Sequence, residues 1–252
     1  MIFTVPVEGG DDIEFECDDT FASRWVCQAI LEDTTYPHLP FVGDVEVILD
    51  VGANCGATTV HLARHHPGAV IHAFEPGRDA RGYLERNVAA YPNVVVHPFG
   101  LGDADRDDVP LFHAQGDIGS ASVLARPTND QGDFEPIQLR DAGAWAAAEG
   151  IDHVDILKVD VEGLEVVVLE SLAALLPTVK VLYVEYDSRA DRRRIMAMLD
   201  DTHELYLALL MTLDQGECVF LRKDLADVEG ARDRLVEIYF GARRAAAAAA
   251  GG

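Results

Sequence analysis

The chain has 252 residues, of which 49% are hydrophobic and 25% are charged. A chain of this length and composition can bury one large core without disulfides or a bound metal, which excludes a disordered or fibrous protein. Its 44 acidic and 20 basic side chains give a formal net charge of -24, which repels a phosphate backbone and argues against nucleic acid as a partner.

The cysteines and the apolar segments bear on where the protein acts. The four cysteines form no C-x-x-C pair and no regular framework, which is typical of reduced thiols. No apolar run approaches the roughly 20 residues that span a bilayer, and the amino terminus has no basic segment followed by an apolar one. We therefore expect a cytoplasmic protein with no membrane partner.

The amino-terminal residues predict an extension over residues 1–42. Apolar and polar positions alternate around Gly9-Gly10-Asp11, which favours a hairpin. Thr20 is then placed to cap a helix that runs to about Leu31.

From Val45 onward, short apolar runs alternate with amphipathic stretches. This pattern is typical of parallel strands that crossover helices cover on both faces. The expected strands are 45–50, 69–74, 94–97, 154–159 and 179–185, and the expected helices are 57–65, 79–89, 163–175 and 189–200.

Two further strands, 205–213 and 218–222, are separated only by residues 214–216. Because this connection is too short for a crossover helix, the two strands must pair antiparallel. The sequence thus predicts an α/β fold over residues 43–223, with a doubly wound, mostly parallel seven-stranded sheet and a terminal antiparallel hairpin. This arrangement resembles the Rossmann-like class I methyltransferase fold. Residues 224–252 are expected to form a helix and an alanine and glycine tail.

Residues 103–141 interrupt the alternation of strands and helices. The segment consists of short alternating pieces separated by glycines and a proline, and it is too long for an idle loop. We expect a substrate-binding insertion in which His113 is a candidate base and Ser120 and Ser122 could meet a substrate, although a surface position is the plainer interpretation of His113. No chemistry is assigned to the three histidines on or after the first crossover helix, His61, His65 and His66.

The first core strand runs through D-V-G-A-N-C-G, residues 50–56, directly into a helix. Glycines at such a bend let the backbone turn sharply and let a ligand approach closely. A dinucleotide loop would read G-x-G-x-x-G, whereas Asp50 here would repel a pyrophosphate but suits the ammonium of S-adenosylmethionine, directly or through a water. Asp50, Gly52, Asn54 and Gly56 are therefore predicted to bind this cofactor.

The next two strands end in further candidates for the same cofactor. Glu75 lies about 23 residues beyond Gly52, near the offset at which an acid meets ribose hydroxyls, and its two oxygens can accept both protons. Pro76 follows it directly and is a further candidate for the cofactor, as is Asp160 where the fourth strand ends. Leu101, after the third strand, is expected to pack on the adenine, whose edge Asp103 or a backbone N–H could contact.

The fourth strand carries D-I-L-K-V-D-V-E-G-L-E, residues 155–165. Together with D-V-G-A-N-C-G, F-E-P and residues 182–185, it resembles the FkbM family of methyltransferases over about residues 20–222. The resemblance implies S-adenosylmethionine as the cofactor and methylation of a hydroxyl on a sugar, polyketide or other natural-product scaffold. The usual Tyr-Glu before the first strand reads Tyr36-Pro37 here, so the sequence departs from the family at that acid.

Three carboxylates are expected to converge where two neighbouring strands end. Asp160 and Glu162 are two residues apart and point the same way if the extended backbone continues, and Glu185 ends the adjacent strand. One of them could act as a general base, or Asp160 and Glu185 could hold a divalent cation. We favour the metal-free base. Glu162 could instead cap a helix beginning at Gly163, and Lys158 is expected to form an ion pair with one of the acids.

The sequence therefore predicts an S-adenosylmethionine-dependent O-methyltransferase that acts on a small hydroxylated acceptor. A small-molecule N-methyltransferase and a non-catalytic cofactor-binding scaffold protein are the alternatives. Whether the protein forms a homodimer is left open.

Overall fold

The computed structural model describes residues 1–6, 12–114, 117–124 and 134–250. For residues 114, 117–120 and 241–250 the description covers the backbone only. The predicted turn at Gly9-Gly10-Asp11 lies outside the described residues.

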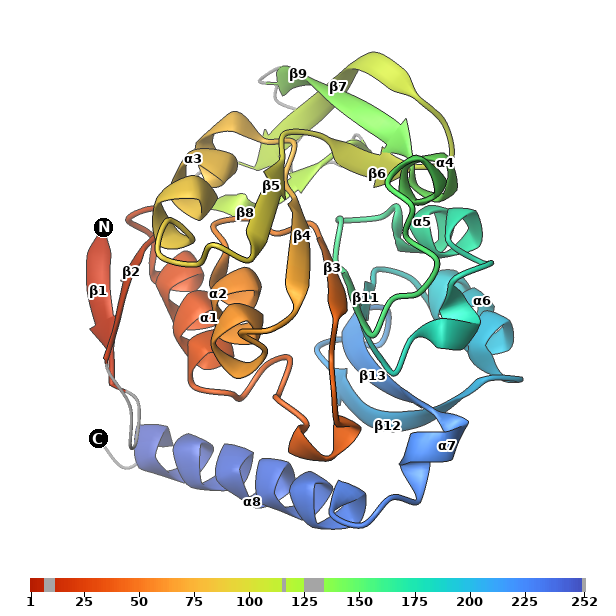
Figure 1. Ribbon diagram of the computed structural model, residues 1–252. Helices are drawn as coiled ribbons and strands as arrows, with labels where there is room; N and C mark the ends of the chain where they lie inside the picture. The colour runs from red at the N-terminus through yellow and green to blue at the C-terminus, as the bar shows by residue number, and fades with distance from the viewer. Residues whose placement is uncertain (7–11, 115–116, 125–133, 251–252) are drawn as a thin grey trace.

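The centre of the molecule is a seven-stranded sheet (Figure 1). Its strands are β3 (Val47–Val51), β4 (Val70–Phe74), β5 (Val94–His97), β10 (Ile156–Val159), β11 (Val181–Tyr186), β12 (His203–Leu210) and β13 (Gly216–Arg222). The order is β12-β13-β11-β10-β3-β4-β5, in which β5, β4, β3, β10 and β11 run parallel and β13 pairs antiparallel with both β11 and β12. The predicted class I methyltransferase fold is confirmed.

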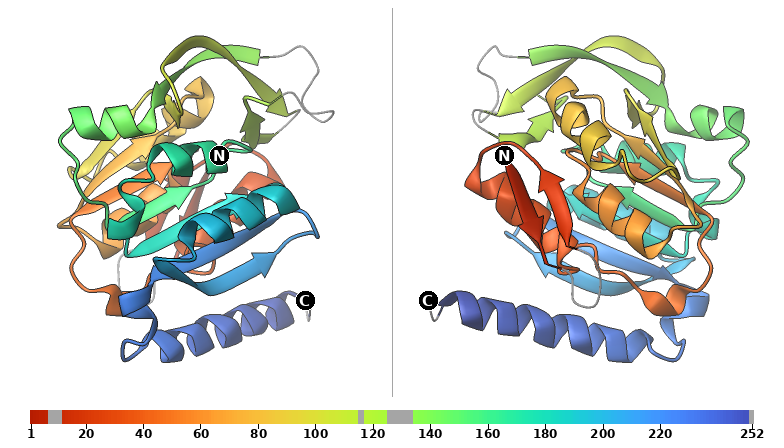
Figure 2. Two further views of the ribbon diagram at one scale, coloured as in Figure 1. Left: turned by 90° about the vertical axis from the view of Figure 1, so that its right-hand side faces the viewer. Right: turned by 60° about the vertical axis from the view of Figure 1, so that its left-hand side comes forward.

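Helices cover both faces of this sheet, as Figures 1 and 2 show. One face carries α1 (Phe21–Leu31), α2 (Ala57–His65) and α3 (Arg78–Asn87), and the other carries α4 (Ala142–Ala148), α5 (Glu165–Ser171) and α6 (Arg189–Leu199). Successive strand residues serve opposite faces, since Ile48 packs with the first set and Leu49 with the second. Burial on both faces explains why the central strands are almost wholly apolar.

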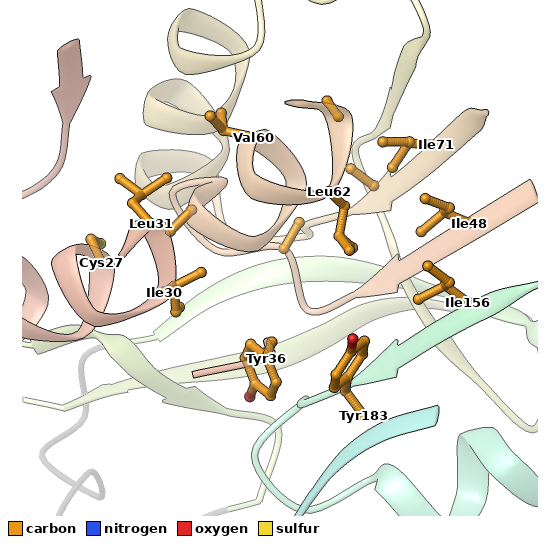
Figure 3. Packing of buried hydrophobic residues seen from close by; sticks show 14 of the residues in the cluster. Cys27, Ile30, Leu31, Tyr36, Ile48, Val60, Leu62, Ile71, Ile156 and Tyr183 are labelled. Carbon is orange, nitrogen blue, oxygen red and sulfur yellow. The ribbon is translucent and has the colours of Figure 1, made fainter. Parts of the chain in front are cut away.

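The apolar core on the α1 and α2 face of the sheet extends into the amino-terminal extension. Figure 3 shows Ile48, Ile71 and Ile156, from three neighbouring strands, facing Leu62 of α2. The same cluster continues to Tyr36, which precedes the short helix η1 (Pro40–Val42). This packing ties the amino-terminal extension to the sheet.

The amino-terminal extension forms as predicted. Strands β1 (Ile2–Val5) and β2 (Ile13–Glu16) pair antiparallel. The side chain of Thr20 accepts the N–H of Ser23 at the start of α1, as its capping role requires.

The helix after β10 begins later than the sequence predicts. Glu162 and Gly163 have left-handed backbones, with φ of 59° and 116°, so the helix cannot start at Gly163. The alternative role of Glu162 as a cap is therefore wrong. Glu165 holds the bend instead, because its carboxylate accepts the N–H groups of Val161 and Gly163 at 3.0 and 2.9 Å. Helix α5 ends at Ser171, four residues before the predicted end, and the short helix η2 (Leu176–Thr178) follows after a turn.

The insertion builds a second sheet above the ends of the central strands (Figure 1). Its order is β6 (Gly100–Gly102), β9 (Phe134–Asp141), β7 (Arg106–Ala114) and β8 (Asp117–Ser122). Leu111, Ile137 and Leu139 form its small apolar core. The segment is therefore a folded unit, and Asp141 at its end caps α4, a helix that the sequence analysis missed.

The carboxyl-terminal part holds α7 (Lys223–Ala226) and α8 (Ala231–Ala250). Helix α8 continues into the alanine run that was expected to be a tail, because alanine has the highest helix propensity. Arg234 of α8 donates to the carbonyl of His38 and to the carboxylate of Asp33. None of the helices in the described part of the chain has an apolar stretch of the length that a bilayer requires.

Candidate active site at the strand ends

Two pockets lie side by side at the carboxyl ends of the central strands. The small pocket has a volume of about 80 Å³ and lies between the ends of β3, β4 and β10 and the insertion sheet. The large pocket has a volume of about 300 Å³ and lies between α1, the loop after β3 and the ends of β10, β11 and β13. Both pockets are lined by the same four residues where they join: Gly52, Asn54, Asp160 and Glu162.

The loop after β3 can be built only with glycine at two points. Gly52 has a φ of +82°, and a Cβ there would lie 1.8 Å from the carbonyl oxygen of Asp160. Gly56 has a φ of +90°, and a Cβ there would lie 2.7 Å from Cδ1 of Leu84 on α3. Gly52 thus lets the loops after β3 and β10 touch beside the pockets, whereas Gly56 serves helix packing and lines neither pocket.

Glu75 is a buried carboxylate at the wall of the small pocket. Its Oε2 accepts the N–H of Asn54 at 2.8 Å and its Oε1 accepts the N–H of Gly77 at 2.7 Å. Burial raises the pKa of this carboxyl to about 7, against the opposite effect of the two N–H donors. Each oxygen keeps a further lone pair, so the carboxylate can still accept two hydroxyl protons. Pro76 and Leu101 line the same pocket.

Asp50 is placed differently from its expected role. It is fully buried, accepts the hydroxyl of Thr59 at 2.6 Å, and lines neither pocket. Its Oδ1 lies 3.6 Å from Nζ of Lys158, and that ammonium donates to the carbonyl of Gly52 at 2.5 Å. This geometry favours a positioning role for Asp50 over direct contact with a ligand. The ion-pair role predicted for Lys158 is confirmed.

The three predicted carboxylates do converge. Asp160, Glu162 and Glu185 each place an oxygen within 4.8 Å of the others. Burial, and then the charge of Asp160, strongly raises the pKa of Glu185. Burial acts the same way on Asp160, but it is outweighed there by Lys158, whose Nζ is 3.4 Å from Oδ2, together with hydrogen bonds from Glu185 and Tyr36, and the pKa of Asp160 falls. The pair therefore shares one proton, which Glu185 holds while Asp160 is ionised.

Tyr36 is a site residue that the sequence analysis did not find. Its backbone is left-handed, with a φ of 54°, and its hydroxyl donates to Oδ2 of Asp160 at 3.0 Å. Its ring packs edge to face on Tyr183 at 5.7 Å between centroids (Figure 3). The contact joins residues 124 positions apart, and the one sequence signal was that Tyr36 stands at the tyrosine of the family's Tyr-Glu motif.

Glu217 is a second site residue that was missed. It lies on β13 directly beside Glu185 of β11 and lines the large pocket. Burial, and then the charge of Asp160, raises its pKa to about 7. An acid next to the apolar run Cys218-Val219-Phe220-Leu221 was the one available sequence signal.

Of the residues predicted in the insertion, His113 and Ser122 line neither pocket. His113 places Nε2 at 3.6 Å from Oε1 of Glu135 and lines neither pocket. The hydroxyl of Ser122 donates to the carbonyl of Glu162 at 2.7 Å, so it supports the bend after β10. The side chain of Ser120 lies outside the described residues.

Residues 50–220 match the Methyltransferase FkbM domain. The chain belongs to the FkbM family of methyltransferases. With this family and this fold, the cofactor is S-adenosylmethionine. The buried Glu75 with its spare lone pairs and the close approach allowed by Gly52 fit that cofactor.

The individual relatives share less than 30% sequence identity with this chain. The chain is 27% identical to the AMB antimetabolite synthetase AmbE of Pseudomonas aeruginosa over 81% of its own length and 12% of that protein. It is 29% identical to Methyltransferase 1 of Beauveria bassiana, covering 59% of this chain and 67% of that one. It is 23% identical to the 2-O-methyltransferase NoeI of Sinorhizobium fredii, covering 57% and 64%.

Among solved structures the similarity is weaker. The fibrillarin pre-rRNA processing protein of Methanococcus jannaschii superposes with a TM-score of 0.48 at 12% identity, over 88% of each chain. A likeness at this level says nothing about the substrate.

Proposed function

We propose that this FkbM-family chain transfers a methyl group from S-adenosylmethionine to a hydroxyl oxygen of a small molecule. The observation that carries the proposal is the position of Asp160, an ionised carboxylate where the two pockets meet. A ligand on each side would bring methyl donor and acceptor together at this side chain. The similarity to a 2-O-methyltransferase supports an oxygen acceptor.

The small pocket is the proposed place for the adenosine. Glu75 would accept the ribose hydroxyls, Pro76 would line the same wall and Leu101 would pack on the adenine. At about 80 Å³ this pocket is too small for the whole cofactor, so the methionyl end would extend past Gly52 and Asn54 toward the large pocket. When bound, the cofactor supplies a methyl group on a sulfonium.

The carboxylates are the proposed reaction machinery. In-line transfer requires the acceptor oxygen, methyl carbon and sulfur to be collinear, and the hydroxyl proton must leave. Asp160 is the ionised member of the group and is the proposed acceptor of that proton. Protonated Glu185 can donate a hydrogen bond to a second oxygen of the acceptor, and Glu162 lines the junction beside them. His113 is not part of this arrangement.

A divalent cation is the second way to use the same residues. Three carboxylates with oxygens within 4.8 Å of one another suit Mg²⁺, which would orient the acceptor hydroxyl and lower its pKa. We favour the metal-free base because Lys158 already neutralises part of the charge. Activity that EDTA abolishes and Mg²⁺ restores would decide for the cation.

An amine acceptor is the second candidate function. Among the described residues, the large pocket is lined by five carboxyl groups and by one lysine or arginine, Lys158, which is already paired with Asp50 and Asp160. Such a pocket attracts a cation, and an ammonium group would be held close to Asp160. The acceptor class therefore has to be measured.

The test begins with calorimetric titration of the full chain with S-adenosylhomocysteine. Transfer of a labelled methyl group is then measured against matched panels of sugars, other polyols and amines, and product masses and fragments locate the methyl group. We expect binding and a hydroxyl product. An amine product would favour N-methylation, tight binding with no transfer would favour a scaffold protein, and absence of binding would refute the assignment.

We also propose that the protein acts in the cytoplasm on small molecules and not on nucleic acid. The buried cysteine thiols and the net charge of -24 support this. A homodimer stays a prediction, to be checked by light scattering.

A further inference from the structure

A second group of side chains that can bind a ligand lies away from the two pockets, between α1 and α2. Asp33 follows α1 with a left-handed backbone, its φ being 63°. His61 and His65 are four residues apart on α2, so they share one face of the helix. The carboxylate and the two imidazoles place one donor atom each within 4.8 Å of the others.

His61 carries an unsatisfied nitrogen in this group. The side chain is 2% exposed, and its Nε2 has no hydrogen-bond partner among the described residues. It lies 3.3 Å from Oδ1 of Asp33 but is not aligned to form a hydrogen bond. Since buried polar atoms are nearly always satisfied in folded proteins, this nitrogen calls for a partner that the described residues do not provide.

The carboxylate is already held in place. Oδ1 of Asp33 accepts the backbone N–H of His38 at 2.6 Å, and Oδ2 is paired with Arg234 of α8. Hydrogen-bonded carboxylates of this kind are the usual ligands of bound metals, because their partners fix the oxygen in position. The ring of His38 stacks on that of His65, with 4.1 Å between centroids and 9° between planes, which orients the second imidazole.

We propose that Asp33, His61 and His65 form a Zn²⁺ site. Two imidazole nitrogens and one carboxylate oxygen are a known Zn²⁺ ligand set, to which a water adds the fourth ligand. His65 is exposed while His61 is buried, so the ion has an entry path and the water has a place.

The site would connect parts of the chain that are far apart in sequence. It joins the turn after α1 to α2, and through Arg234 it reaches α8. Asp33 is also three residues before Tyr36, which donates to Asp160 in the large pocket. The role of the ion is therefore structural, because it would hold the segment that contains Tyr36 in place.

The test uses the full chain without a histidine tag, stripped with a chelator and dialysed. Zn²⁺ is titrated in competition with a coloured chelator, and the bound metal is counted by mass spectrometry. The matched variants are His65→Ala, which removes an exposed ligand, and His153→Ala, which removes a half-buried histidine elsewhere. Asp33→Asn is a further ligand variant, and Co²⁺ serves as a coloured substitute whose visible spectrum reports nitrogen ligands.

We expect one tightly bound Zn²⁺ per chain and a higher melting temperature with the ion. His65→Ala and Asp33→Asn should each weaken binding by more than roughly tenfold and abolish the thermal shift, while His153→Ala should change neither. Circular dichroism of the metal-free variants checks that they are folded. Equal binding by the parent and His65→Ala would mean adventitious binding to other histidines and would overturn the proposal, as would no binding at all.

Discussion

The small pocket and the large pocket differ in how the chain builds them. The small pocket takes its polar groups from the ends of successive strands, so that Gly52 and Glu75 belong to short motifs. The large pocket takes Tyr36 from the extension, Glu185 from β11 and Glu217 from the terminal hairpin. The contrast indicates that the polar groups of the proposed cofactor side come from local motifs, whereas those of the proposed acceptor side meet only after distant segments have packed.

The largest effect is expected at the junction. Replacing Asp160 with asparagine keeps the shape but removes the proposed proton acceptor, so kcat should fall by about 10²- to 10⁴-fold. Cofactor affinity, measured by calorimetry, should change far less. The matched control is Asp152→Asn, an exposed aspartate outside both pockets. A kcat within a few-fold of the parent would remove Asp160 from the reaction.

The next largest effect distinguishes the roles proposed for the two pockets. Glu75→Gln removes a charged acceptor of two ribose hydroxyls, so the Kd for S-adenosylhomocysteine should rise by about 10- to 100-fold. The KM for the acceptor should stay nearly constant, because Glu75 does not line the large pocket. Glu149→Gln, at an exposed position, is the control. An unchanged Kd would place the ribose elsewhere and would end the division of roles between the pockets.

Tyr36→Phe probes the link from the extension to Asp160. The hydroxyl stabilises the ionised form of Asp160, so its loss raises that pKa and moves the acid limb of the kcat/KM profile to higher pH. Because Asp160 stays ionised at neutral pH in this variant, kcat/KM should change there by no more than a few-fold, and the larger change should lie in the acid limb. Tyr91→Phe, outside both pockets, should change nothing. A profile that falls in height without moving would assign Tyr36 a packing role alone.

The smallest effect is on stability. Burial raises the pKa of Glu217 to about 7, above the ordinary 4.5, so the folded state binds this proton more tightly than the unfolded state does. The stabilisation of the folded state that this tighter proton binding provides is complete below the ordinary pKa and is lost as pH rises through about 7. Compared with the parent protein, Glu217→Gln should therefore gain about 1 kcal/mol in free energy of unfolding above that pH.

Urea denaturation from about pH 5 to about pH 8 measures this difference. The variant should lose less free energy of unfolding across the range than the parent. Equal pH dependence in both proteins would show that Glu217 keeps an ordinary pKa. Cofactor affinity is the internal control, since Glu217 lines the large pocket alone.

The comparison also explains which site residues the sequence could predict. Asp160, Glu162 and Glu185 were found because parallel strands end at one edge of a sheet, so their terminal acids must meet there. Asp50 also lies near a strand end, in the D-V-G-A-N-C-G motif, but the direction of its side chain was not predictable. It points beneath the loop to Lys158 and Thr59, and that depends on the packing of α2 against β3.

The alternation of apolar runs was enough to predict the sheet, its crossover helices and the closing hairpin, because strand and helix periods are written locally along the chain. The D-V-G-A-N-C-G bend and Glu75 were predictable in the same way, since each is set by its own strand. Only the tertiary structure decided that Tyr36 reaches Asp160 and that Asp33 meets His61 and His65. Such contacts depend on the angles at which packed helices and strands cross, and a local sequence pattern carries no record of those angles.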